Sequence, residues 1–393
     1  MIAFSSPRPT LWTSAFLTCL GLNMCVFLGF FMLLPTLSLY LVAVGCDEKV
    51  IGLIFATFAV SSVLSRFGAN RISQKYGYLA IIRCGLVFCA LGSFLYFLIQ
   101  RPLSYAFARL LFGAGYGLTS TLVVTIAVSV IPPTRLAEGL GYLGLGATVA
   151  LAIGPIAGLW LFATMGHTAL FCGVAGCYVL AVLVSLRLPK TKAAPPKTGS
   201  SWSIATTIKT LYQPSLLIFL YGMAVAAVSA YLAVYCVEKN LPNAANYFLV
   251  STIGALFSRL TSGRIYDRYG SRAVVVPAAA IVGLALILIY LAQSVFSYYL
   301  AAVLYGLGVG PLFPGLQALA FSSAPRDKMT TASAFFYTFN DIGVSVGTMI
   351  MGFLANSQGS FGTSYLLGAG LMALIIVFFL AFFPRKRANR QSL

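Results

Sequence analysis

One acidic side chain lies in the middle of an apolar segment, where a charge is costly. Only seven Asp and Glu occur among the 393 residues, and Asp341 stands inside the run FFYTFNDIG, about ten residues into an expected helix at 331–355. A carboxylate without a partner in hydrocarbon is expensive and tends to take up a proton. Asp341 is therefore either a cavity-facing group that titrates or contacts substrate, or a structural hydrogen-bond or ion-pair partner within the C-terminal half.

A basic side chain is expected in a similar position. Arg109 begins the segment RLLFGAGYG, about five residues into an expected helix at 104–130. It either faces the interior, where it would assist proton transfer or contact an anionic substrate group, or extends to the outer headgroups. Glu138, at the expected membrane edge, is a further acid that could carry protons.

Few other polar groups are expected at depth. The candidates for a binding cavity are amides and aromatic residues that could line it: Asn23, Gln317, Asn340, Tyr116, Tyr337, Phe313 and Phe339. No nucleophile–base pair, metal-ligand spacing or phosphate loop is found, and an ATP-driven pump would need such a loop. The sequence predicts a protein that is not an enzyme and uses no metal or cofactor.

The composition indicates the medium in which these groups are held. Hydrophobic residues make up 60% of the chain and charged residues 8%, whereas a soluble domain carries about 25% charged residues. A spanning helix needs about 20 mainly apolar residues, and the chain offers twelve such runs. They lie at 11–42, 50–68, 79–99, 104–130, 139–162, 168–186, 214–236, 246–263, 273–293, 297–321, 331–355 and 363–383.

The basic residues are distributed unequally between alternate loops. If the N-terminus is cytoplasmic, all Lys and Arg except Lys49, Arg101, Arg109 and Lys239 fall in cytoplasmic segments. The positive-inside rule then places both termini in the cytoplasm, with anionic lipid headgroups as partners. The net charge of +18 therefore reflects topology, and binding of nucleic acid is not expected.

A long-range repeat divides the chain. SRFGANRISQKYG at 65–77 matches SRLTSGRIYDRYG at 258–270, an offset of 193 residues. Both copies fall between the second and third helices of a six-helix set, which is the plan of transporters built from parallel repeats. The expected organisation is a six-helix bundle at 1–186, a cytoplasmic linker at 187–213 and a second bundle at 214–393.

Two motifs give the chain a specific resemblance. The second repeat copy, GRIYDRYG, resembles the loop signature G-x-x-x-D-R-x-G of the major facilitator superfamily, although the first copy has Asn70 and Gln74 in place of Gly and Asp. RLLFG resembles the family's fourth-helix pattern R-x-x-x-G. The resemblance implies a gating role for the loop residues Arg66, Arg71, Gly77, Arg259, Gly263, Arg264, Asp267, Arg268 and Gly270.

The fifth helix resembles one branch of that family. Ala150, Gly154, Pro155 and Gly158 are similar to the antiporter motif G-x-x-x-G-P-x-x-G of drug:proton exporters, with Ala150 in place of the first glycine. A Gly-Pro step bends a helix, and small residues allow close helix packing. Members of that branch often carry an acid on the first helix, and this chain has none there. Coupling must therefore use Asp341 or Glu138, or be absent.

The expected fold is an all-α polytopic membrane protein of the major facilitator type, with twelve transmembrane helices in two six-helix repeats. The resemblance implies a secondary active transporter in a bacterial inner membrane, working as a monomer. It would export a small organic solute by alternating access in exchange for protons. The alternatives are a dedicated exporter of a metabolite or metal-chelating molecule, an importer of the same fold, and a membrane sensor without transport.

Overall fold

The computed structural model describes residues 10–98, 101–132, 135–188, 204–324 and 329–383, and the regular structure in these ranges is helical. The helices are α1 (Ser14–Ala43), α2 (Glu48–Tyr76), α3 (Tyr78–Leu98), α4 (Pro102–Val130), α5 (Leu136–Ser185), α6 (Ile204–Glu238), α7 (Ala244–Tyr269), α8 (Ser271–Tyr290), α9 (Val295–Ser322), α10 (Met329–Gln358) and α11 (Gly362–Phe382).

These helices provide twelve membrane passes. Within the described residues, ten helices are long and apolar enough to span a bilayer. One of them, α5, is interrupted at Gly166, whose φ of 79° ends one helix and begins the next. It therefore supplies the two passes that were expected at 139–162 and 168–186. The twelfth pass is α7, which is more polar and packs along α9.

The helices that carry the repeated motifs are longer than expected. Helix α2 continues to Tyr76 and α7 to Tyr269, which are equivalent residues of the two motif copies. Each helix ends directly at a glycine with positive φ, Gly77 at 90° and Gly270 at 82°. The expectation that the motif residues form a loop was therefore wrong for the described residues that precede these two glycines. Neither motif contains a proline, so the helix continues until the glycine ends it.

The start of α6 also differs from the expected boundary. It begins at Ile204, inside the expected linker, and passes through Pro214 without ending. The run IATTIKTLYQ has no turn-forming residue, which explains why it can extend the helix towards its N-terminal side. Residues 189–203 of the expected linker lie outside the described residues. The division of the chain into bundles at 186 and 214 stays a prediction.

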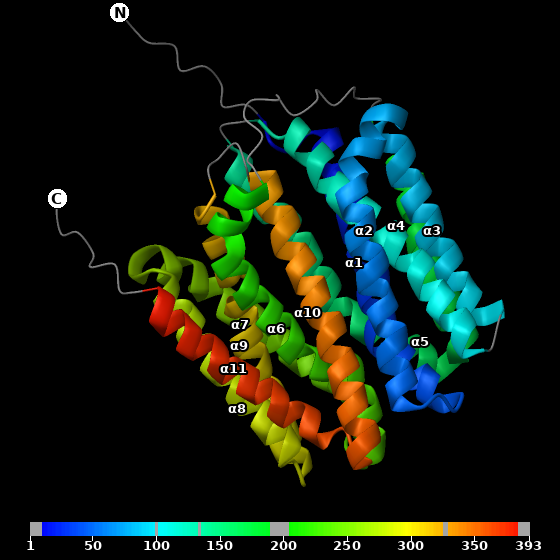
Figure 1. Cartoon of the computed structure of the whole chain (residues 1–393), viewed down its shortest axis with the longest axis vertical. Helices are drawn as coiled ribbons and strands as arrows, with labels where there is room; N and C mark the ends of the chain where they lie inside the picture. The colour runs from blue at the N-terminus through cyan, green and yellow to red at the C-terminus, as the bar shows by residue number, and fades with distance from the viewer. Residues whose placement is uncertain (1–9, 99–100, 133–134, 189–203, 325–328, 384–393) are drawn as a thin grey trace, which may run out of the picture.

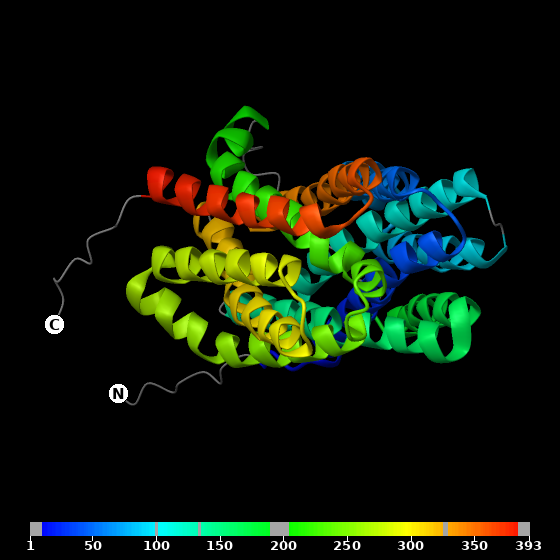
Figure 2. The same cartoon turned by 90° about the horizontal axis from the view of Figure 1, so that it is seen from below.

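The helices form two groups that lie side by side (Figures 1 and 2), with α1–α5 in one and α6–α11 in the other. Their internal packing repeats with the sequence offset. Gly113 on α4 packs against Phe58 of α2, and Gly306 on α9 packs against Ser251 of α7. Both members of the second pair lie 193 residues beyond those of the first. The small residues let the backbones approach closely at the same place in each half.

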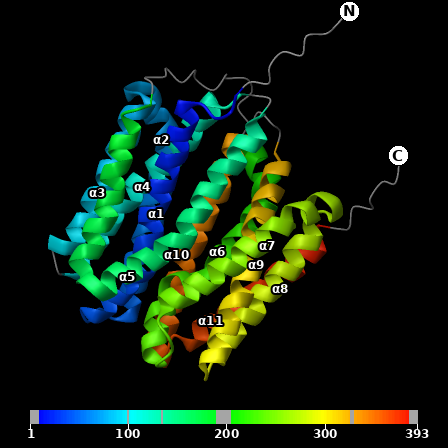
Figure 3. The same cartoon turned by 180° about the vertical axis from the view of Figure 1, so that it is seen from behind.

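The two halves meet along two seams. Helix α2 packs against α10, with Gly52 beside Met349 and Gly352 beside Glu48. Helix α5 packs against α7 on the other side of the molecule (Figure 3). Ser38 of α1 also donates a hydrogen bond to the Ala230 carbonyl oxygen of α6. The contacts of Gly52, Gly352 and Ser38 lie towards the end of the molecule where α1 finishes and α2 begins.

Candidate functional site between the two halves

A buried ion pair crosses from one half to the other. The Arg66 guanidinium on α2 donates to the Asp341 carboxylate on α10, and each side chain is 6% exposed. Asp341 thus has an ion-pair partner, as one of the two expectations stated, but this partner belongs to the N-terminal half and not to the C-terminal half. Asp341 also lines the central cavity described below. Taking two charges out of water is expensive, so each of them depends on the other for its stability.

Aromatic rings and weak polar contacts complete the surroundings of this pair. The Arg66 guanidinium carbon lies 5.7 Å from the centre of the Tyr116 ring, within the range of a cation–π contact. Its Nε lies 3.4 Å from the Ser62 hydroxyl oxygen, one turn earlier on α2. Beside the pair, Phe27 of α1 and Tyr337 of α10 meet across the halves, with ring centres 6.3 Å apart.

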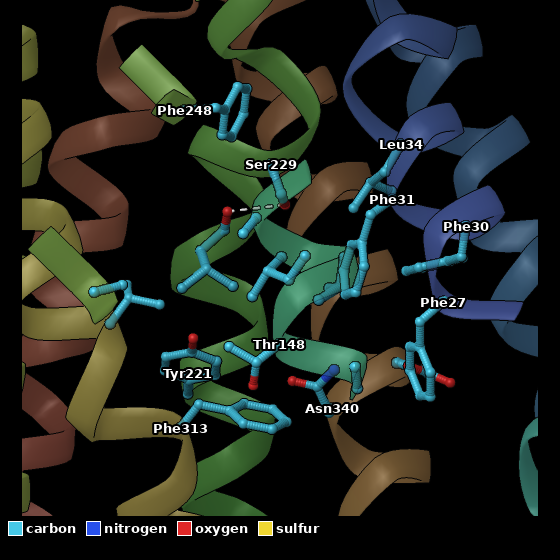
Figure 4. A pocket seen from close by; sticks show the side chains of 18 of the residues that line it. Phe27, Phe30, Phe31, Leu34, Thr148, Tyr221, Ser229, Phe248, Phe313 and Asn340 are labelled. Carbon is cyan, nitrogen blue, oxygen red and sulfur yellow. Dashed lines mark hydrogen bonds between the residues drawn. The ribbon is translucent and has the colours of Figure 1, made fainter. Parts of the chain in front are cut away.

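A central cavity of about 160 Å³ lies on one side of the ion pair and is lined by both halves. Asp341, Asn340 and Tyr337 reach it from α10, and Arg109 and Tyr116 reach it from α4. Most of the rest of its wall is aromatic. Figure 4 shows Phe27, Phe30 and Phe31 on one side of the space and Tyr221 and Phe313 on the other.

A smaller pocket lies on the other side of the pair, and Phe27, Gly144 and Tyr337 belong to the walls of both spaces. Arg66 lines this smaller pocket, whereas Asp341 lines the central cavity. The ion pair and the Phe27–Tyr337 contact therefore separate the two spaces. Opening both contacts would connect them.

Two of the expected cavity amides belong to the smaller pocket. Asn23 donates a hydrogen bond of 3.0 Å to the Leu143 carbonyl oxygen of α5. Gln317 donates one of 3.0 Å to the Tyr337 hydroxyl oxygen. Asn340 does line the central cavity, and its buried Oδ1 has no hydrogen-bond partner among the described residues.

Arg109 is fully enclosed. It is 1% exposed, so it does not extend to the end of its helix. Its guanidinium carbon lies 4.8, 4.5 and 5.6 Å from the ring centres of Phe55, Phe58 and Phe112. Its Nε and Nη1 have no hydrogen-bond partner among the described residues, and the residue forms part of the cavity wall. Three aromatic faces thus hold a cation that forms no ion pair with a described carboxylate.

A second cross-half contact mirrors the ion pair. Arg259 on α7 donates to the Thr148 hydroxyl on α5, and its Nε donates to the Gly310 carbonyl oxygen at 3.1 Å. Arg259 and Thr148 both line the central cavity. They lie 193 residues from Arg66 and Asp341 respectively, the same offset as the repeat. One seam is therefore closed by an ion pair and the other by a neutral acceptor.

The antiporter-type motif packs α5 against α1. A side chain at Gly154 would meet Phe31 and Met32, and one at Gly158 would meet the Met32 carbonyl. Ala150 is fully buried, and Pro155 lies inside the helix. This close approach brings the α1 aromatics and Thr148 of α5 to the same cavity.

The remaining expected gating residues lie away from the cavity. Arg71, Arg264 and Arg268 are exposed near the ends of α2 and α7, as is Gly263. The side chains of Glu138 and Asp267 lie outside the described residues. Within the described part of the chain, no group of three His, Cys, Asp or Glu is placed to hold a metal ion.

Sequence reasoning missed the roles of three side chains. Arg66 and Arg259 were assigned to the gating motifs at the ends of the expected helices 50–68 and 246–263, but each lies well inside a longer helix and reaches the interface. Thr148 was not singled out. The repeat offset holds the signal that could have found them, because adding 193 to the positions of Arg66 and Thr148 gives Arg259 and Asp341.

The chain belongs to the major facilitator superfamily of transporters. The family model described as Major Facilitator Superfamily matches residues 19–348 and 243–393. Relatives include an MFS-type transporter of Methanocaldococcus jannaschii, 24% identical over 89% of this chain and 91% of its own length. The quinolone resistance protein NorA of Staphylococcus aureus is 22% identical over 90% and 92%. The multidrug resistance protein MdtG of Escherichia coli is 24% identical over 93% of both chains.

Solved structures share the fold. A mutant form of the nucleoside transporter NupG superposes with a TM-score of 0.75 at 17% identity, covering 94% of this chain and 100% of NupG. A variant of the fucose:proton symporter FucP of E. coli gives 0.61 at 19% identity, covering 94% and 98%. The expected all-α major facilitator fold is thereby confirmed.

Proposed function

We propose that the protein is a proton-coupled exporter of small organic solutes, and that the Arg66–Asp341 pair couples proton binding to opening of one end of the central cavity. The buried ion pair between α2 and α10 carries this proposal. In the proposed orientation both termini lie in the cytoplasm of a bacterial cell, so the smaller pocket lies on the cytoplasmic side of the pair.

The charge state of Asp341 sets the strength of this closure. A charged carboxylate holds Arg66 and keeps α2 against α10. A proton on the carboxylate removes its charge, which leaves the guanidinium without its counter-ion and favours separation of the two helices. Protonation thus opens the cavity towards the cytoplasm, and loss of the proton allows the pair to form again.

This order of events matches antiport. A proton bound from outside would return the empty transporter to the state open to the cytoplasm. Solute would load there, the proton would leave, and the ion pair would close behind the solute. The names of two relatives, a quinolone resistance protein and a multidrug resistance protein, support export. NupG and FucP, a nucleoside transporter and a fucose:proton symporter, keep import as the second candidate.

The coupling step can be tested without knowing the solute. In a background without reactive cysteines, spin labels at Gln74 on α2 and Ser322 on α9, both exposed, report the separation of the halves at the proposed cytoplasmic end. We expect the measured distance to lengthen as the pH is lowered from about 8 to about 4, because burial favours the uncharged form of the Asp341 carboxyl group. Asp341→Asn should remove this response, while Asp47→Asn, at an exposed acid, should keep it.

Either of two results would contradict the proposed coupling: no change of distance with pH in the parent protein, or the same change in Asp341→Asn. Direction is tested in everted membrane vesicles with norfloxacin, uridine and fucose as probes. Export predicts that acidifying the vesicle interior drives probe uptake and that a protonophore abolishes it. Uptake that ignores the gradient would exclude proton coupling for that probe.

A further inference from the structure

The two cross-half contacts leave an imbalance of charge at the central cavity. Asp341 is the one carboxylate in the described cavity wall, and it is engaged by Arg66. Arg109 and Arg259 also line the cavity, one from each half, and no described carboxylate lies within ion-pair distance of either. The described wall therefore presents two cations that form no ion pair of their own, although Asp341 also attracts Arg109 at longer range.

The internal repeat explains how this imbalance arises. Arg259 occupies the position of Arg66, but its partner Thr148 stands where the other half has Asp341. A hydroxyl oxygen accepts a hydrogen bond without neutralising the guanidinium. Arg109 has no counterpart either, because the residue 193 positions later is Ala302. Each additional positive charge thus belongs to one half alone.

Arg109 also has unused hydrogen-bonding capacity. A guanidinium has five N–H donors in a planar fork that suits carboxylate and phosphate groups. Two of the nitrogen atoms of Arg109, Nε and Nη1, have no partner among the described residues although the side chain is almost wholly buried. A buried polar group without a partner is costly, and an anionic ligand would remove that cost.

The aromatic residues of the cavity wall indicate the chemical nature of the uncharged part of the ligand. Phe27, Phe30 and Phe31 face Tyr221 and Phe313 across the space (Figure 4). Aromatic side chains bind flat apolar groups by offset or edge contacts, and ligand cavities usually combine such a wall with a few polar anchors. The cavity disfavours a cationic ligand, because such a ligand would be repelled by the two arginines and the one carboxylate is already paired with Arg66.

We propose that the central cavity takes organic anions with an aromatic body, whose acidic group is attracted by the positive charges of Arg109 and Arg259. The inference rests on the proposed function, since it names the substrate class of that transport site. Thr148 then acts as a specificity-determining residue, because its neutrality leaves the charge of Arg259 for the ligand.

Three probes that share one ring system isolate the effect of charge: 2-naphthoate, 2-naphthamide and 2-naphthyltrimethylammonium. Their dissociation constants are measured by calorimetry on the purified full-length protein in detergent at fixed pH. Hydrogen bonds to a charged group contribute about 1.5–3 kcal/mol, so the anion should bind about tenfold or more tightly than the other two.

Variants assign the anion preference to residues. Arg259→Gln and Arg109→Gln should each weaken naphthoate binding about tenfold and leave naphthamide binding nearly unchanged. Arg187→Gln, at an exposed arginine away from the cavity, is the matched control and should change neither. Thr148→Asp is the sharpest variant, because it keeps both arginines but supplies Arg259 with a counter-ion. It should remove most of the preference for the anion.

The proposal is overturned if the cation or the amide binds the parent protein as tightly as naphthoate. It is equally overturned if Arg259→Gln and Thr148→Asp both leave naphthoate affinity intact. Should a variant fail to fold, the ranking of the three probes on the parent protein still decides. Binding is measured without a pH gradient, so failure here leaves the pH response of Asp341 standing, and loss of that response leaves the anion preference standing.

Discussion

Thr148 and Asp341 occupy equivalent positions in the two halves, 193 residues apart, and each accepts a hydrogen bond from an arginine of the opposite half. The arginines, Arg66 and Arg259, are separated by the same offset. The molecule therefore has two symmetric seams with the same donor and different acceptors. In the proposed mechanism this difference makes the α2–α10 seam sensitive to protonation and leaves the α5–α7 seam with a permanent positive charge.

The ion pair predicts a strong coupling between its two members. Arg66→Gln or Asp341→Asn alone should lower the free energy of unfolding by about 3 kcal/mol, because each leaves a buried charge unpaired. The double variant should recover most of the loss. Equilibrium unfolding in mixed micelles with increasing SDS measures all three. If the two single effects simply add in the double variant, the pair does not contribute as described.

Removing the acceptor of the second seam, Thr148, should lower the free energy of unfolding by less than removing the acceptor of the ion pair. Thr148→Val removes the hydroxyl acceptor at nearly constant volume, but Arg259 keeps its 3.1 Å hydrogen bond to the Gly310 carbonyl oxygen. Arg259 is also only partly buried. We therefore expect a loss of about 1 kcal/mol, smaller than that for Asp341→Asn in the same unfolding assay. An equal or larger loss would mean that the two seams contribute alike.

The sequence predicted the twelve passes closely because membrane spans are set by length and hydropathy, which are local properties. The bend at Gly166 falls between the expected helices 139–162 and 168–186. The ends of α2 and α7 were misplaced because polar residues such as Arg71 and Arg264 can remain helical at a membrane edge, where their side chains are exposed.

The partners of the site residues could not be predicted in the same way. Hydropathy shows that Asp341 is buried, but not which helix supplies its counter-ion. That choice depends on how α2 packs against α10, a contact between residues 275 positions apart. The same holds for Arg109, whose three aromatic neighbours come from two helices. The repeat offset alone connects the two seams, and it does so only when one of them is already known.

Asn23 is a buried polar residue that we expect to contribute to stability and not to proton coupling. It is 3% exposed and donates to the Leu143 carbonyl oxygen, which ties α1 to α5. Asn23→Ala should lower the free energy of unfolding by about 1–2 kcal/mol without changing the pH response of the Gln74–Ser322 distance. Asn246→Ala, at an exposed amide, serves as the control for unfolding. A lost pH response in Asn23→Ala would place this amide in the coupling path.

Helix α5 approaches α1 most closely at Gly158 and Gly154. A methyl group at Gly158 would press against the Met32 backbone, whereas one at Gly176 on the same helix would meet no atom nearby. Overpacking of this kind costs about 1–3 kcal/mol, so Gly158→Ala should destabilise the protein. Gly176→Ala should be neutral or slightly stabilising, because alanine favours the helix. Both are compared by SDS unfolding. Since Met32 adjoins the α1 aromatics, Gly158→Ala should also weaken naphthoate binding, and Gly176→Ala should not. If both variants behave alike, the close approach of α1 and α5 does not shape the cavity.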